Sequence, residues 1–112
     1  MAGRRSVAVG GDQGQARPRA RRPVSAATLW EIAIKQALGK IAAPADLPER
    51  VRDSGFRELP IGFSHAIAAG RLPLIHRDPF DRMLVAQARC EDLTLVTRDP
   101  RCQQYDVAIL PA

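Results

Sequence analysis

Three acidic residues stand where a predicted helix begins or a predicted strand ends, and they are the candidates for chemistry. Glu31 falls in the first turns of one predicted helix, Asp81 in the first turn of another, and Asp99 directly follows the apolar run LTLVT. Loops at the carboxyl ends of parallel strands converge on one crevice, so the three carboxylates could meet at one rim. Clustered carboxylates repel each other unless a cation holds them, and hard oxygen ligands suit Mg²⁺ or Mn²⁺. Such an ion can lower the pKa of a bound water and stabilise the charge that develops on a phosphodiester.

Each acid also has a purely structural interpretation, which the spacing leaves open. Glu31 can pair with Lys35 four residues later on the same helix, a contact worth about 0.2–0.5 kcal/mol. Asp81 and Asp99 can act as favourable charges or caps at helix N-termini. Asp78 is predicted to be an N-cap only, worth about 1 kcal/mol.

The elements that must position these acids alternate between strands and helices. Asp78, followed by a proline and an apolar run, predicts the strongest helix. Alternation of this kind predicts an α/β fold with a mostly parallel sheet flanked by helices. The predicted order is a strand end at Val24, a helix from an N-cap at Ser25 to about Gly39, a short helix at 46–55, a strand at 56–61, a helix at 64–70, a helix at 78–91, a strand at 93–97, a helical turn at 99–105 and a strand at 107–110.

Length and composition favour one folded domain outside the membrane. A chain of 112 residues, 46% of them hydrophobic, can bury a single core, although only 4% are aromatic. No apolar run approaches the roughly 18 residues of a membrane span, and no apolar stretch follows the N-terminal arginines, so a cytoplasmic protein is predicted. The two cysteines, Cys90 and Cys102, lack zinc-ligand spacing and are predicted to be reduced thiols.

The net charge of +5 lies in the N-terminal segment. Residues 1–22 hold six arginines against Asp12, whereas residues 23–112 hold eleven basic and eleven acidic residues. The composition of the first segment, rich in Gly, Ala, Pro, Arg and Gln, predicts a disordered basic tail. The global charge therefore says nothing about a nucleic-acid surface on the domain itself.

Four collinear segments resemble the PIN-domain ribonucleases of the VapC toxin type: VSAATLWEIAIKQALGK, GFRELPI, HRDPFDRMLVAQA and LTLVTRDP, within residues 24–110. The resemblance implies a PIN-like fold and an acidic site that holds Mg²⁺ or Mn²⁺ and hydrolyses RNA phosphodiesters. It also implies a cognate antitoxin that blocks the site, as in type II toxin–antitoxin systems, and a homodimer. By position in these motifs, Glu31, Asp81 and Asp99 are the implied catalytic metal ligands, whereas Asp78 is not usually counted among them.

One family motif is missing from the sequence. Members of this family begin with a strand that resembles D-T-H or D-T-S, whose aspartate is the first metal ligand, and the only acid before Val24 is Asp12, between glycines. That strand lies in the middle of the family's sheet, so its absence would expose its neighbours. Residues 1–23 include 16 Ala, Gly, Arg or Pro residues, types with GC-rich codons. We therefore expect a tail that is not native PIN sequence, followed by an N-terminally truncated or frameshifted PIN domain at 23–112. SVAV, at residues 6–9, is the alternative occupant of the strand position.

Two functions besides a toxin ribonuclease remain open. A catalytically dead remnant would fold, or bind an antitoxin or a sister subunit, without cleaving RNA. A protein that binds RNA through the arginine-rich tail would lose that binding when residues 1–22 are deleted. The ribonuclease differs from both because loss of Asp99 should abolish cleavage and leave binding largely intact.

Several other polar or aromatic residues near the acids can be explained by ordinary structural roles. His65 and His76 lack a second histidine at ligand spacing, so surface or satisfied core positions are predicted for them rather than metal binding. Trp30 belongs to the apolar series of the first helix and is predicted to lie in the core. Three arginines flank the acids and could either hold phosphates or balance charge: Arg77, Arg82 and Arg98.

Overall fold

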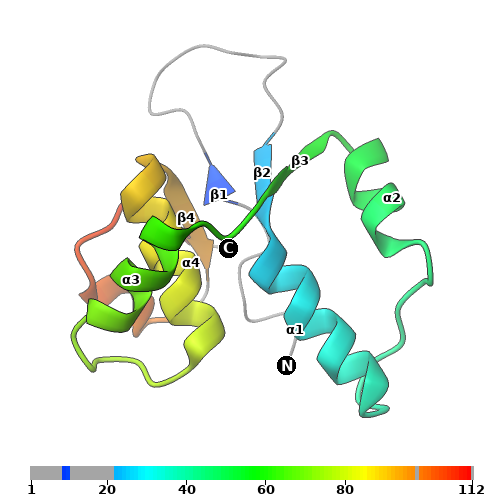
Figure 1. Cartoon of the computed structure of the whole chain (residues 1–112), viewed down its shortest axis with the longest axis horizontal. Coiled ribbons are helices and arrows are strands. Elements are labelled where there is room, and N and C mark those ends of the chain that lie inside the picture. Colours follow the sequence, from blue (N-terminus) through cyan, green and yellow to red (C-terminus); the bar gives the residue numbers. More distant parts are fainter. Residues whose placement is uncertain (1–8, 11–21, 98, 112) are drawn as a thin grey trace.

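The computed structural model describes residues 9–10, 22–97 and 99–111 (Figure 1). The strands are β1 (Val9–Gly10), β2 (Arg22–Ser25), β3 (Phe56–Leu59), β4 (Thr94–Thr97) and β5 (Ile109–Pro111). The helices are α1 (Ala26–Ala37), α2 (Leu47–Asp53), α3 (Phe63–Arg71) and α4 (Pro79–Glu91), with a 3-10 turn η2 (Cys102–Gln104) before β5. None of the helices in this described part is long and apolar enough to span a membrane. The predicted disordered tail falls almost wholly outside the described residues, as do Asp12 and Arg98.

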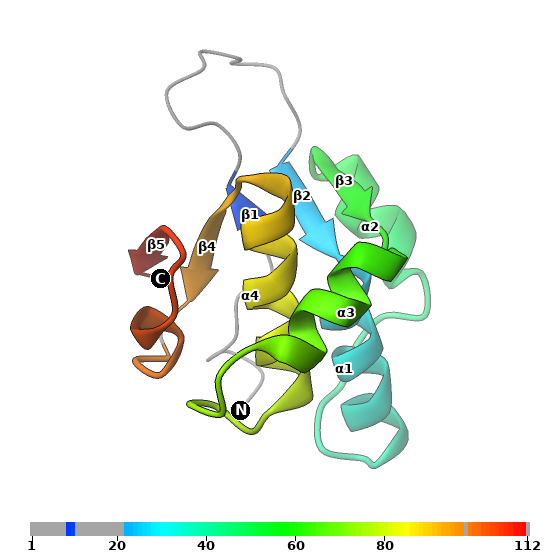
Figure 2. The same cartoon turned by 60° about the vertical axis from the view of Figure 1, so that its left-hand side comes forward.

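The strands form two small sheets. β2 pairs in parallel with β3, in a register that sets Ser25 opposite Leu59. β4 pairs in parallel with β5, and there Leu95 lies opposite Ile109. β1 lies between β2 and β4 in both views of the chain (Figures 1 and 2) and pairs antiparallel with β4. The helices pack around these strands, so the predicted α/β class is confirmed.

For the centre of the predicted sheet, the sequence left two possibilities open. A truncated domain would lack a central strand, whereas SVAV at 6–9 could supply one. The described segment between the two parallel pairs is β1, which is two residues long and contains Val9 of that run. Residues 6–8 lie outside the described residues. β1 therefore lies between the two parallel pairs, as the edge strand of the β1–β4–β5 sheet, and it runs antiparallel to β4.

Ser25 and Gln87 fix α1 relative to α4. The Ser25 hydroxyl oxygen accepts a hydrogen bond from the Ala27 amide at 3.0 Å, which confirms the predicted N-cap. The same hydroxyl donates to Oε1 of Gln87 at 2.5 Å, and Nε2 of Gln87 donates to the Pro60 carbonyl at 3.2 Å. Both side chains are fully buried, so these bonds satisfy groups that would otherwise be costly to bury. The end of β2 is thereby tied to α4.

The hydrophobic core lies under one face of α4. Val85 and Ala86 of this helix and Leu95 of β4 have no exposed surface. Asp81 stands one turn before Val85, and side chains four residues apart share a helix face. Burial of the apolar part of α4 therefore also carries Asp81 into the interior.

The apolar side of α1 faces outward, so the core position predicted for Trp30 was wrong. Trp30 is 60% exposed and Leu38 is 64% exposed, and Ile34 lies at the surface between them. The buried side of α1 carries Ala27 and Glu31 instead. A period of 3.6 residues identifies an apolar face but does not say which neighbour covers it. We call the surface formed by Trp30, Ile34 and Leu38 the α1 surface.

Candidate active site

Asp78 begins α4 and sets the position of Asp81. Oδ1 of Asp78 accepts hydrogen bonds from the Phe80 amide at 2.9 Å and from the Asp81 amide at 3.3 Å, so the predicted N-cap is confirmed. Asp81 follows in the first turn and is only 2% exposed. A carboxylate buried to this degree requires a donor or a positive charge nearby.

Asp99 is held by a tight turn at the end of β4. Its amide donates to Oγ1 of Thr97 at 3.1 Å, and its Oδ1 accepts from the Arg101 amide at 2.9 Å. The side chain is 6% exposed. These two local bonds orient the carboxylate so that Oδ2 faces the loop that precedes α4.

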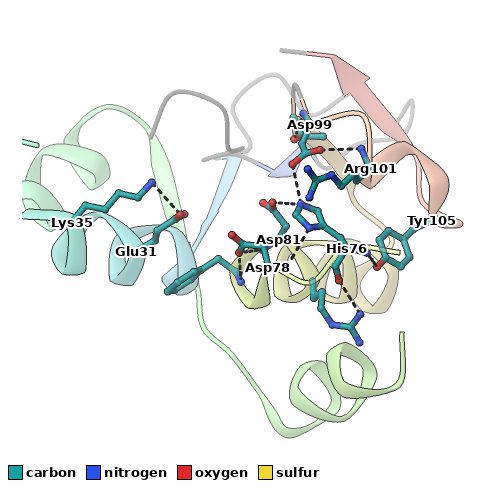
Figure 3. Close-up of polar contacts among 11 residues, drawn as sticks. Glu31, Lys35, His76, Asp78, Asp81, Asp99, Arg101 and Tyr105 are labelled. Carbon is teal, nitrogen blue, oxygen red and sulfur yellow. Dashed lines mark hydrogen bonds and ion pairs between the residues drawn. The ribbon is translucent and has the colours of Figure 1, made fainter. Parts of the chain in front are cut away.

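His76 joins the two aspartates (Figure 3). Its Nε2 lies 2.7 Å from Oδ2 of Asp81 and 2.9 Å from Oδ2 of Asp99. The ring is itself buried. Two of the three predicted acids therefore meet at one point, one from the start of α4 and the other from the end of β4.

The environment of Asp99 favours its charged form. Burial raises the pKa of Asp99, but the Arg101 amide, the His76 ring and the Arg101 charge together lower it by more. The pKa therefore lies below its ordinary value of 3.8. At neutral pH, Asp99 is therefore a negatively charged carboxylate.

Glu31 lies on α1, away from the His76 contact. Its carboxylate is 3.3 Å from Nζ of Lys35, which confirms the predicted pair four residues apart. Figure 3 shows Glu31 and Lys35 on the far side of Asp78 from His76. The role of Glu31 as a third metal ligand stays a prediction.

Asp81 and Asp99 fit a hard divalent cation, because both offer buried carboxylate oxygens. Among the described residues, one set of ligand atoms lies within 4.8 Å of one another, and it belongs to His76, Asp81 and Cys102. However, the Asp78 amide donates to Nδ1 of His76 at 3.3 Å. The ring proton therefore sits on Nε2, which makes that nitrogen a donor rather than a metal ligand. A cation would therefore draw its ligands from carboxylates, that of Asp81 within this set and that of Asp99 outside it.

Sequence reasoning missed the part that His76 plays in this site. A satisfied core position was one of its two predicted places, and the ring is indeed buried and hydrogen-bonded. Its contact with both acids was not foreseen. The available signal was the HRDPFD run, in which a proline turn brings a histidine close to the first turn of the next helix.

Arg82 has a structural role that was not among its two predicted roles, phosphate binding and charge balance, both of which stay predictions. Its guanidinium donates to four backbone carbonyls that end α3 and shape the loop before α4. The acceptors are Ala69 at 2.8 Å, Leu72 at 2.9 Å, Pro73 at 3.0 Å and His76 at 3.2 Å. Arg82 thus holds the loop that carries His76.

The structural role of Asp78 can be tested with two substitutions. Asp78→Ala removes the cap and should lower the free energy of unfolding by about 1 kcal/mol, whereas Asp78→Asn keeps a capping oxygen and should change it little. Urea denaturation measures both. Loss of RNA cleavage in a stable Asp78→Asn variant would contradict the assignment, because it would make the charge of Asp78 part of the site.

Comparison with known proteins identifies the family of the chain. A PIN domain family model matches residues 14–109, a range that includes all three predicted acids, Glu31 in α1, Asp81 in α4 and Asp99 after β4. No curated protein and no solved structure matches the chain. PIN domains are α/β proteins and are generally metal-dependent nucleases. Because the match spans most of the chain and the fold agrees with it, the chain belongs to the PIN domain family of nucleases.

Proposed function

We propose that the chain is a Mg²⁺- or Mn²⁺-dependent endoribonuclease toxin of the VapC type, acting in the cytoplasm within a type II toxin–antitoxin module. The observation that carries the proposal is the convergence of Asp81 and Asp99, two buried carboxylates from separate elements, on His76. Glu31 is the third proposed catalytic acid, by its position in the SAATLWE motif. The proposed substrate is the RNA phosphodiester.

The two aspartates would hold the ion through carboxylate oxygens. A divalent ion held there would lower the pKa of a water bound to it and offset charge on the phosphodiester oxygens. Burial of Asp81 and Asp99 strengthens their attraction for a cation, since charges interact more strongly away from bulk water. The Arg101 amide holds Oδ1 of Asp99, so that Oδ2 faces His76.

The α1 surface is the proposed binding site of the antitoxin. The Trp30 ring contacts the Phe80 ring edge-on, with 5.2 Å between centroids, and Phe80 directly precedes Asp81 in α4. A protein that covers the apolar α1 surface therefore also covers the start of α4. Exposed apolar surfaces of this kind mark protein interfaces.

A second exposed apolar surface lies along α3 and the loop after it, and it is the proposed homodimer interface. Phe63 is 94% exposed and Leu74 is 83% exposed, with Ile67 between them on α3. This surface belongs to another element than the α1 surface. A second copy and an antitoxin could therefore bind at the same time.

A catalytically inactive remnant is the second candidate function. It is favoured by β1, which lies between the two parallel pairs but is only two residues long and runs antiparallel to β4. Such a chain would bind the antitoxin through the α1 surface without cleaving RNA.

The chemistry of the RNA ends tests the proposed reaction. Water activated by a metal ion should leave 5′-phosphate and 3′-hydroxyl ends, whereas attack by the neighbouring 2′-hydroxyl leaves a 2′,3′-cyclic phosphate. Purified chain, RNA and Mn²⁺ are incubated, and the ends are identified by ligation and mass spectrometry. Cyclic phosphate ends would contradict the proposal, and a folded chain that cuts no RNA would support the inactive remnant.

A further inference from the structure

The ring of His76 lies where a cation would have to bind if Asp81 and Asp99 both held it. Nε2 of His76 lies 2.7 Å from Oδ2 of Asp81 and forms a hydrogen bond of 2.9 Å with Oδ2 of Asp99. A carboxylate oxygen that accepts this hydrogen bond has its lone pair directed at the ring. The same oxygens are the hard ligands proposed for Mg²⁺ or Mn²⁺.

The surroundings of His76 hold the ring in this orientation. Its amide donates to the Tyr105 hydroxyl at 2.8 Å, and that hydroxyl donates to the Pro73 carbonyl at 2.8 Å. Its own carbonyl accepts from Arg82, and Nδ1 accepts from the Asp78 amide. The protein thus holds the ring in contact with both acids.

We propose that His76 is a positioning residue that competes with the divalent cation, because its Nε2–H contact with Asp81 and Asp99 must open when the ion binds. The inference rests on the proposed metal site. His76 keeps the two carboxylates together until the ion takes over this role. The consequence is that the ring weakens metal binding while it stabilises the protein without an ion.

Linkage gives the direction of the expected effects. An interaction made only without the ion lowers the affinity for the ion, and binding of the ion weakens that interaction to the same extent. His76→Ala should therefore bind Mn²⁺ more tightly, by roughly tenfold within the usual coupling range of about 5–150-fold. It should also unfold at a lower temperature in EDTA, since two buried carboxylates lose their shared donor. His76→Gln places an amide donor near the position of Nε2 and should restore part of both properties.

The chain provides a matched control in His65, its other histidine. His65 is equally buried, with Nδ1 accepting from the Gly62 amide at 2.9 Å and Nε2 2.8 Å from Glu91. His65→Ala should lower the unfolding temperature but leave the Mn²⁺ affinity unchanged. A general loss of stability is thereby separated from competition with the ion.

The experiment combines calorimetric Mn²⁺ titration of the full chain and its variants with NMR of the histidine rings during Mg²⁺ titration of the unmutated chain. Tighter Mn²⁺ binding by His76→Ala, together with a Mg²⁺-dependent shift of the His76 ring signals but not those of His65, is expected. Equal or weaker binding by a folded His76→Ala variant would overturn the proposal, as would His76 signals that do not respond to bound Mg²⁺. If the unmutated chain binds neither ion, the proposed metal site itself fails, which is a different outcome from binding without competition.

Discussion

Asp99→Asn is expected to reduce metal-dependent RNA cleavage by at least about 100-fold, since loss even of a residue that only supports a metal ligand costs about 10–100-fold. The substitution keeps the size of the side chain and an oxygen for the Arg101 amide, so the turn after β4 should survive. It removes the negative charge that the proposed ion requires. RNA binding should stay within about twofold, because phosphate contacts depend on basic groups.

The matched control for this substitution is Asp106→Asn, at an exposed aspartate in the segment between η2 and β5. It changes the net charge by the same amount and should leave cleavage unchanged. Initial rates on a labelled RNA and binding in EDTA measure the two properties separately. An Asp99→Asn variant that cleaves at the normal rate would contradict the role of Asp99 as a metal ligand.

Arg82→Ala is expected to lower the free energy of unfolding by roughly 3 kcal/mol. Its guanidinium makes four hydrogen bonds of 2.8–3.2 Å to backbone carbonyls, and hydrogen bonds to charged groups are worth about 1.5–3 kcal/mol each, although not additively. Removal leaves the end of α3 and the loop carrying His76 without these donors. Metal-dependent cleavage should fall with stability, because the same loop leads into Asp78 and Asp81 at the start of α4.

Two further variants separate charge from hydrogen bonding. Arg82→Lys keeps the charge but lacks the planar fork of donors, so it should lose about half as much stability as Arg82→Ala. Arg89→Ala removes an exposed arginine from the last turn of the same helix and should be nearly neutral. Chemical denaturation checks all three. If Arg82→Ala were as stable as Arg89→Ala, the hydrogen bonds to the four carbonyls would contribute nothing to the free energy of unfolding.

The helices and strands could be predicted well because their boundaries depend on local chemistry. Ser25 and Asp78 cap the helices that follow them, as predicted from their types and positions. Gly39 and Gly55 have φ angles of 74° and 94°, which suit glycine and explain why the chain leaves α1 and α2 just before them. The signal for each of these boundaries lies within a few residues of it.

The contacts that build the site could not be predicted in the same way, since they join distant segments. Asp99 contacts His76 across 23 positions of sequence, and Arg82 contacts Ala69 across 13. Nothing in the local pattern states that a histidine ring will meet an acid from another element. The outward face of α1, with Trp30 exposed, shows the same limit, because which face is covered depends on the partner.

RNA cleavage by the unmutated 112-residue chain in Mn²⁺ or Mg²⁺ tests the central claim most directly, when it is repeated in EDTA and after the ion is restored. The proposal predicts cleavage that stops in EDTA, returns with the ion and is lost in Asp81→Asn. Cleavage that persists in EDTA or in Asp81→Asn would contradict a metal site built on Asp81 and Asp99. A chain shown by circular dichroism to be folded that never cuts RNA would contradict the proposed activity itself.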